Sequence, residues 1–139
     1  IGGSTFILTM SMLFRNLEIL RDYPKEANHI KNGDNFLTSI LGQYGKGKFM
    51  GDIKPAVYRR HSSGIWSKLT EEQKTASKLT SYYWTYQYFN RVQNSTGQKA
   101  FLNKIAQSLN KIDKEHNLIV IKKGILSKYF SFLSKLFKH

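Results

Sequence analysis

The chain has 139 residues, of which 40% are hydrophobic, and its 22 Lys and Arg against nine Asp and Glu give a net charge of +13. Nine Phe and eight Tyr can form a buried core, which excludes a largely disordered chain. The absence of cysteine excludes disulfides and thiolate metal sites, and no apolar run reaches the roughly 18 residues of a membrane-spanning helix. The charge favours an anionic partner: nucleic acid, acidic lipid or a phosphorylated small molecule.

The first half of the sequence predicts a mixture of strands and helices. The apolar, partly β-branched run from Thr5 to Phe14 predicts a buried strand, and it follows no basic region of the kind that begins a signal peptide. A short helical turn is expected before Pro24. A helix is expected from Asp34 to just before Gly45. Its apolar face would hold Phe36, Leu37, Ile40, Leu41 and Tyr44. The run `KGKFMGDIKPAVYRR` then predicts two short extended pieces with a turn between them.

The second half predicts helices. Thr70 and Gln73 have the spacing of a capping box, and the apolar stripe expected to follow is Ala76, Leu79, Tyr83 and Tyr86. Another helix is expected to follow Ser95 or Thr96, and a basic amphipathic helix is expected within 124–139. We therefore predict an α/β region, residues 1–69, followed by a helical C-terminal region, residues 70–139.

Two features of the first half could carry chemistry. The stretch `GQYGKGKF` approaches a phosphate-binding loop, but Phe49 replaces the hydroxyl residue and a helix precedes the glycines, so we reject that interpretation. Asp34 has two possible roles. It can be a plain helix N-cap, or an exposed carboxylate that acts as a general base.

The segment Tyr58–Ser67, `YRRHSSGIWS`, concentrates polar groups. Its two arginines offer planar forks suited to a diphosphate, and the alternative is a solvated basic strand end. His61 is a metal ligand, a phosphate donor or a surface histidine. Trp66 is either a core residue or a stacking platform.

The order and spacing of these segments resemble the C-terminal, acceptor-side half of bacterial family-2 glycosyltransferases. The resemblance rests on `STFILTMSMLFRN`, `GDNFLTSILGQYGKGKFM` and `PAVYRRHSSGIWSKLTEEQK`, and covers roughly residues 4–90. It implies a partial GT-A (Rossmann-like) domain with few strands. It also implies transfer of a sugar, with inversion, from a nucleotide-sugar to a hydroxyl of a glycan or lipid-linked acceptor.

The resemblance also assigns roles to residues. Asp34 aligns with the base that takes the acceptor's proton. Arg59, His61, Ser62, Gly64 and Ser67 align with the lid over the donor diphosphate, with His61 also a candidate metal ligand. Trp66 and Tyr58 would border the sugar or acceptor pocket. Two positions depart from the family pattern, Asn35 where Trp is usual and Ser63 where Gly is common.

The resemblance further implies a divalent metal, Mg²⁺ or Mn²⁺, but the chain has no Asp-x-Asp or Asp-Asp pair to supply most of its ligands. We therefore expect the chain to be inactive without a nucleotide-binding half. We expect a cytoplasmic enzyme, with residues 117–139 as a candidate contact to an anionic membrane at its inner face. The alternative is a basic module that binds nucleic acid or anionic membrane, in which the aromatics of `SYYWTYQYFNR` stack on bases. The spacing in Tyr58–Ser67 favours the transferase over nucleic-acid binding.

Overall fold

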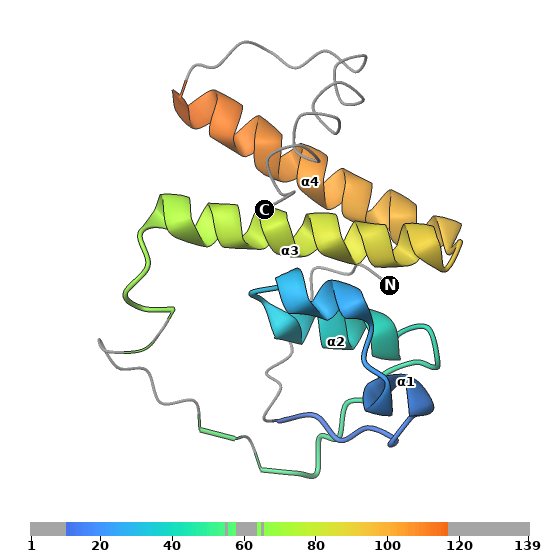
Figure 1. The fold of residues 1–139 in the computed structure, drawn as a ribbon. Helices are drawn as coiled ribbons and strands as arrows, with labels where there is room; N and C mark the ends of the chain where they lie inside the picture. The colour runs from blue at the N-terminus through green and yellow to red at the C-terminus, as the bar shows by residue number, and fades with distance from the viewer. Residues whose placement is uncertain (1–10, 55, 58–63, 65, 117–139) are drawn as a thin grey trace. The chain divides into compact units, whose positions relative to one another are not determined.

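The computed structural model describes residues 11–54, 56, 57, 64 and 66–116, and all structural statements concern these residues. Figure 1 shows their helices in chain order. They are α1 (Glu18–Arg21), the 3₁₀ helix η2 (Lys25–His29), α2 (Gly33–Leu41), α3 (Glu71–Arg91) and α4 (Ser95–His116).

The expected α/β fold is wrong for this part of the chain, which contains four α-helices and no strand. Residues 46–54, 56 and 57, where extended pieces were predicted, form turns and irregular backbone that pair with no other segment. A strand needs a neighbour to bind its backbone N–H and C=O groups, and the described residues provide none. Residues 11–14, the end of the predicted first strand, are not in a strand either. The partial Rossmann-like domain is therefore not formed by these residues.

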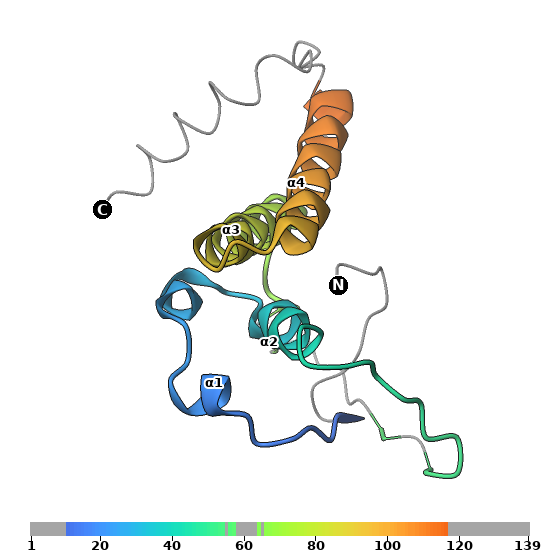
Figure 2. The same cartoon turned by 90° about the vertical axis from the view of Figure 1, so that its right-hand side faces the viewer.

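The core lies where α2 and the first half of α4 pack against α3. Its buried members are Phe36, Ile40, Tyr88, Phe89 and Phe101. The rings of Phe36 and Tyr88 meet edge to face with centroids 5.5 Å apart, and those of Phe89 and Phe101 stack at 5.7 Å. Figure 2 shows η2 and α2 on one side of α3 and α4 on another. α3 is thus the element that joins the other helices.

The predicted start of α3 is confirmed, but its buried face differs from the predicted stripe. Thr70 and Gln73 form both hydrogen bonds of the capping box. Of the predicted stripe only Tyr83 is buried, Leu79 and Tyr86 are half-buried, and Ala76 is exposed. The face is broader because α3 is covered on two sides. Its buried residues are Ser77, Ser81, Tyr83, Thr85, Tyr88 and Phe89.

The turn between α3 and α4 depends on polar contacts that the sequence pattern did not indicate. Gln93 adopts a positive φ of 56°, a conformation typical of the residue that ends a helix. The side chain of Asn94 accepts a hydrogen bond from the backbone N–H of Gly97 at 2.9 Å, which caps the start of α4. α4 therefore starts at Ser95, slightly earlier than expected, and Asn94 is the residue whose side chain binds its first turn.

α4 crosses the boundary between two compact units of the chain, which falls after Ile105. Every contact described here lies within the first unit. The C-terminal helix expected within 124–139 lies outside the described residues. In the described ranges no helix combines the length and apolarity needed to cross a bilayer.

Candidate functional site

Asp34 lies in the first turn of α2, with its side chain exposed to solvent. The N-cap of α2 is Asn32, so the interpretation of Asp34 as the N-cap is wrong. An acid in the first turn still interacts favourably with the helix dipole. The position leaves the carboxylate accessible to a molecule that approaches the start of α2, as a general base requires.

The helix that carries Asp34 is held against α3 at three places. The backbone N–H of Asn32 donates to Ser81 Oγ at 3.1 Å, before the first turn. In the middle, Phe36 and Ile40 are buried in the core, with 1% and 0% of their surface exposed. After the last turn, Gln43 donates to the hydroxyl of Tyr88 at 3.1 Å. The backbone of α2 is therefore constrained along its whole length while the Asp34 side chain remains free of packing.

The structure describes only part of the predicted lid. Tyr58, Arg59, His61 and Ser62 lie outside the described residues. Gly64 is half-buried, and Ser67 is exposed. Backbone bonds from Lys68 to Gly64 and from Leu69 to Trp66 form turns that lead into α3.

Trp66 is 39% exposed and takes no part in the core, which excludes the interpretation of this residue as a core residue. No hydrogen bond or ion pair in the described part of the chain joins Asp34 to Gly64, Trp66 or Ser67. Arg59 and His61, the charged residues of the predicted lid, lie outside the described residues, so the structure does not test whether they lie near Asp34. Grouping Asp34 with Tyr58–Ser67 stays a prediction.

The segment between α2 and the lid exposes an unusual number of large apolar side chains. Phe49 and Val57 are 91% and 88% exposed, and no helix covers them. Tyr44, Met50 and Ile53 are exposed as well. The predicted helix face was thus wrong at Tyr44, because α2 ends at Leu41.

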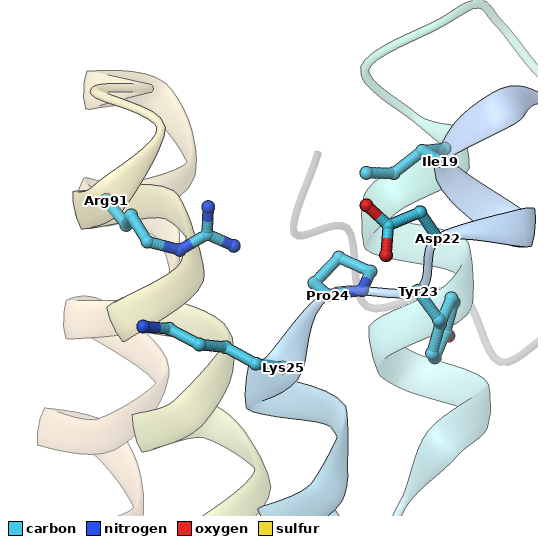
Figure 3. A pocket seen from close by; sticks show the side chains of 6 residues that line it. All are labelled: Ile19, Asp22, Tyr23, Pro24, Lys25 and Arg91. Atoms are coloured by element: carbon cyan, nitrogen blue, oxygen red, sulfur yellow. The ribbon is translucent and has the colours of Figure 1, made fainter.

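A surface depression of about 390 Å³ lies where α1, η2 and the end of α3 meet. Figure 3 shows Arg91 and Lys25 on one side of it, and Asp22 and Ile19 on the other. Tyr23 and Pro24 complete the lining, and burial raises the pKa of the Tyr23 hydroxyl. None of the sequence-predicted site residues lines this depression.

Beside the depression, Glu26 and Arg91 form a bidentate ion pair. The guanidinium donates through Nε and an Nη nitrogen to the two carboxylate oxygens, at 2.7 and 2.9 Å. Glu26 is 4% exposed, whereas the side chain of Arg91 is 46% exposed. The hydrogen bonds from Arg91 hold the pKa of Glu26 below its ordinary value. This pair joins η2 to the end of α3, and Arg91 is already neutralised where it borders the depression.

Sequence reasoning missed Glu26, Arg91 and Ser81 because each acts through a partner 49 or 65 residues away. A single acid in `PKEAN` and a serine within a polar-aromatic helix carry no local signal of such a bond. Asn94 had a signal, since Asn directly before a helix is a preferred N-cap.

The implied divalent metal does not fit the described residues. They contain no group of three or more His, Asp or Glu side chains able to hold a metal ion. His61, the predicted ligand, lies outside the described range.

Comparison of the chain with protein-family models, with curated proteins and with solved structures found no match.

Proposed function

We propose that this chain supplies the acceptor side of an inverting glycosyl transfer from a nucleotide-sugar, with Asp34 as the general base. The observation that carries the proposal is the placement of Asp34: an exposed carboxylate on a helix whose opposite face is fully buried against α3. Such a helix presents one acid to solvent at a defined position. The order of the motifs from Asp34 to Ser67 supports the same reaction.

In this reaction the acceptor hydroxyl oxygen attacks the anomeric carbon as the bond from that carbon to the diphosphate oxygen breaks. The hydroxyl proton passes to the carboxylate of Asp34, which must lie within hydrogen-bond distance of it. The departing diphosphate gains negative charge. The guanidinium of Arg59, with His61, would stabilise that charge, and Trp66, exposed in this structure, would offer an apolar face to a sugar.

The other proposed class, a basic module for nucleic acid, is less well supported. It requires the aromatics of residues 81–91 to stack on bases. Tyr83, Tyr88 and Phe89 are instead buried, and Trp84 stacks on His29 with ring centroids 4.0 Å apart. These rings are engaged within the protein, which favours the transferase.

The test is sugar transfer by the full-length protein that contains this sequence, assayed as nucleoside diphosphate release with a panel of nucleotide-sugars and glycan acceptors. Asp34→Asn keeps the shape and removes the base, so we expect kcat to fall by about 100-fold or more. Asp52→Asn makes the same change in an exposed turn outside the site and should leave kcat unchanged.

Loss of the first-turn charge also weakens the helix slightly, by about 0.3–1 kcal/mol. Glu72→Gln, in the first turn of α3, provides the control for this effect. Undiminished transfer by Asp34→Asn would exclude Asp34 as the base.

A further inference from the structure

The start of α2 lacks a side-chain cap of its own. The N-cap residue Asn32 makes no side-chain hydrogen bond to the first turn, whereas Thr70 and Gln73 close both bonds of the box at the start of α3. Free N–H groups and an uncapped first turn make a helix end prone to fray. The position of the first turn of α2 is therefore set by tertiary contacts, not by its local sequence.

Ser81 of α3 supplies the contact at that end. Its Oγ accepts the hydrogen bond from the Asn32 N–H at 3.1 Å and donates to the backbone carbonyl of Ser77 at 2.8 Å. The hydroxyl proton of Ser81 points to the Ser77 carbonyl, and a lone pair of the same Oγ accepts the hydrogen bond from Asn32. Ser81 is 1% exposed, so no water competes for this arrangement. A buried, doubly bonded hydroxyl thus fixes the backbone at the residue where α2 begins.

The hydrogen bond from Asn32 to Ser81 lies two residues before Asp34 in the sequence. The other contacts that hold α2 lie further along it, at the buried Phe36 and Ile40 and at Gln43. Thr38 Oγ1 also donates to the Asp34 carbonyl at 2.9 Å, which ties the first turn to the second but not to α3. Ser81 therefore provides a polar contact from α3 two residues before the one that bears the carboxylate.

We infer that Ser81 is a positioning residue for the Asp34 carboxylate: by binding the Asn32 N–H it fixes the first turn of α2, and with it the place of the base. This inference rests on the proposed function of Asp34. It concerns orientation, so removal of the bond should affect the chemical step more than the binding of the donor.

The test compares Ser81→Ala with Thr85→Val in the full-length protein. Thr85 is equally buried in α3, and its hydroxyl bonds to the Ser81 carbonyl within the same helix. Both variants remove one buried hydroxyl and should lower stability similarly, but only the first releases α2. We expect amide hydrogen exchange at Asn32, whose N–H loses its acceptor, to accelerate about tenfold in Ser81→Ala alone. We expect kcat to fall about tenfold in the same variant, with KM for the nucleotide-sugar unchanged.

The two readouts separate this inference from the proposed function. Unchanged exchange at Asn32 in Ser81→Ala would overturn the inference, whether or not the protein transfers sugar. Faster exchange at Asn32 with unchanged kcat in Ser81→Ala would also overturn the inference. If Asp34→Asn is inactive in the same experiment, the proposed function of Asp34 still holds. An equal fall of kcat in Thr85→Val would show that general destabilisation, not positioning, is responsible, and would overturn it too.

Discussion

Gly97 is the position where a single added methyl group should be most costly. It lies in the first turn of α4, directly against the ring of Phe89, which is 0% exposed. A Cβ built on Gly97 would overlap Cγ and Cδ1 of that ring and lie 2.7 Å from Cδ2. The obstacle is the ring of a fully buried core residue that packs against Tyr88 and Phe101. It cannot move aside as an exposed side chain would.

The size of the effect follows from two opposing terms. Overpacking of a buried site typically costs about 1–3 kcal/mol. Replacing glycine by alanine in a helix returns up to about 1 kcal/mol. For Gly97→Ala we therefore expect a net loss of about 2 kcal/mol, which shifts the urea midpoint down by about 1–2 M.

Gly33→Ala is the matched control, since Gly33 begins α2 and a Cβ there would meet nothing within 4 Å. We expect it to leave the free energy of unfolding unchanged or to raise it, by up to about 1 kcal/mol. In the background of Phe89→Ala, Gly97→Ala should cost less than half as much, because alanine lacks the Cγ, Cδ1 and Cδ2 atoms that the added methyl group would strike. Urea unfolding followed by circular dichroism measures all of these. Equal midpoints for Gly97→Ala and the wild type would refute the close packing of the α3–α4 turn.

Two further predictions concern charge and capping. Glu26→Gln should lower stability by about 2 kcal/mol at neutral pH. Because Arg91 lowers the folded-state pKa of Glu26, the stabilisation is present above the ordinary carboxyl pKa and is lost as pH falls through the folded value. Thermal unfolding from pH 7 to pH 3 should therefore show the two proteins converge, and a constant difference would contradict the ion pair. Thr70→Ala should cost about 1 kcal/mol by opening the capping box, whereas Thr80→Ala within α3 should be neutral or stabilising, as urea unfolding would show. No loss in Thr70→Ala would show that packing alone defines the start of α3.

The helices of the second half were predictable because their signals are local. The Thr70–Gln73 box lies within four residues, and the helical spacing of Phe101 and Ile105 puts both on the buried face of α4. The helix after Asn32 was also expected, with Phe36 and Ile40 correctly placed in its core. Each of these predictions depends on residues that are neighbours in sequence.

The presence of strands could not be predicted from neighbouring residues in the same way. The run `KGKFMGDIKPAVYRR` predicted two short extended pieces, but extended backbone becomes a strand only when another strand binds it. In the described residues Phe49 and Ile53 meet no such partner and remain exposed. The sequence of this run indicated an extended backbone, but it did not indicate whether another strand would pair with it.

The sequence by itself indicated that helices form near the positions of α2, α3 and α4, and it placed the start of α3 at Thr70, because caps and 3.6-residue spacing are properties of adjacent residues. It also indicated Asp34 as the acid at the start of a helix. Only the tertiary structure decided that Asn32, not Asp34, is the N-cap and that Ser81 holds it. It alone paired Glu26 with Arg91. The physical reason is that a hydrogen bond or ion pair between residues 49 or 65 positions apart forms only after the chain has brought two helices together.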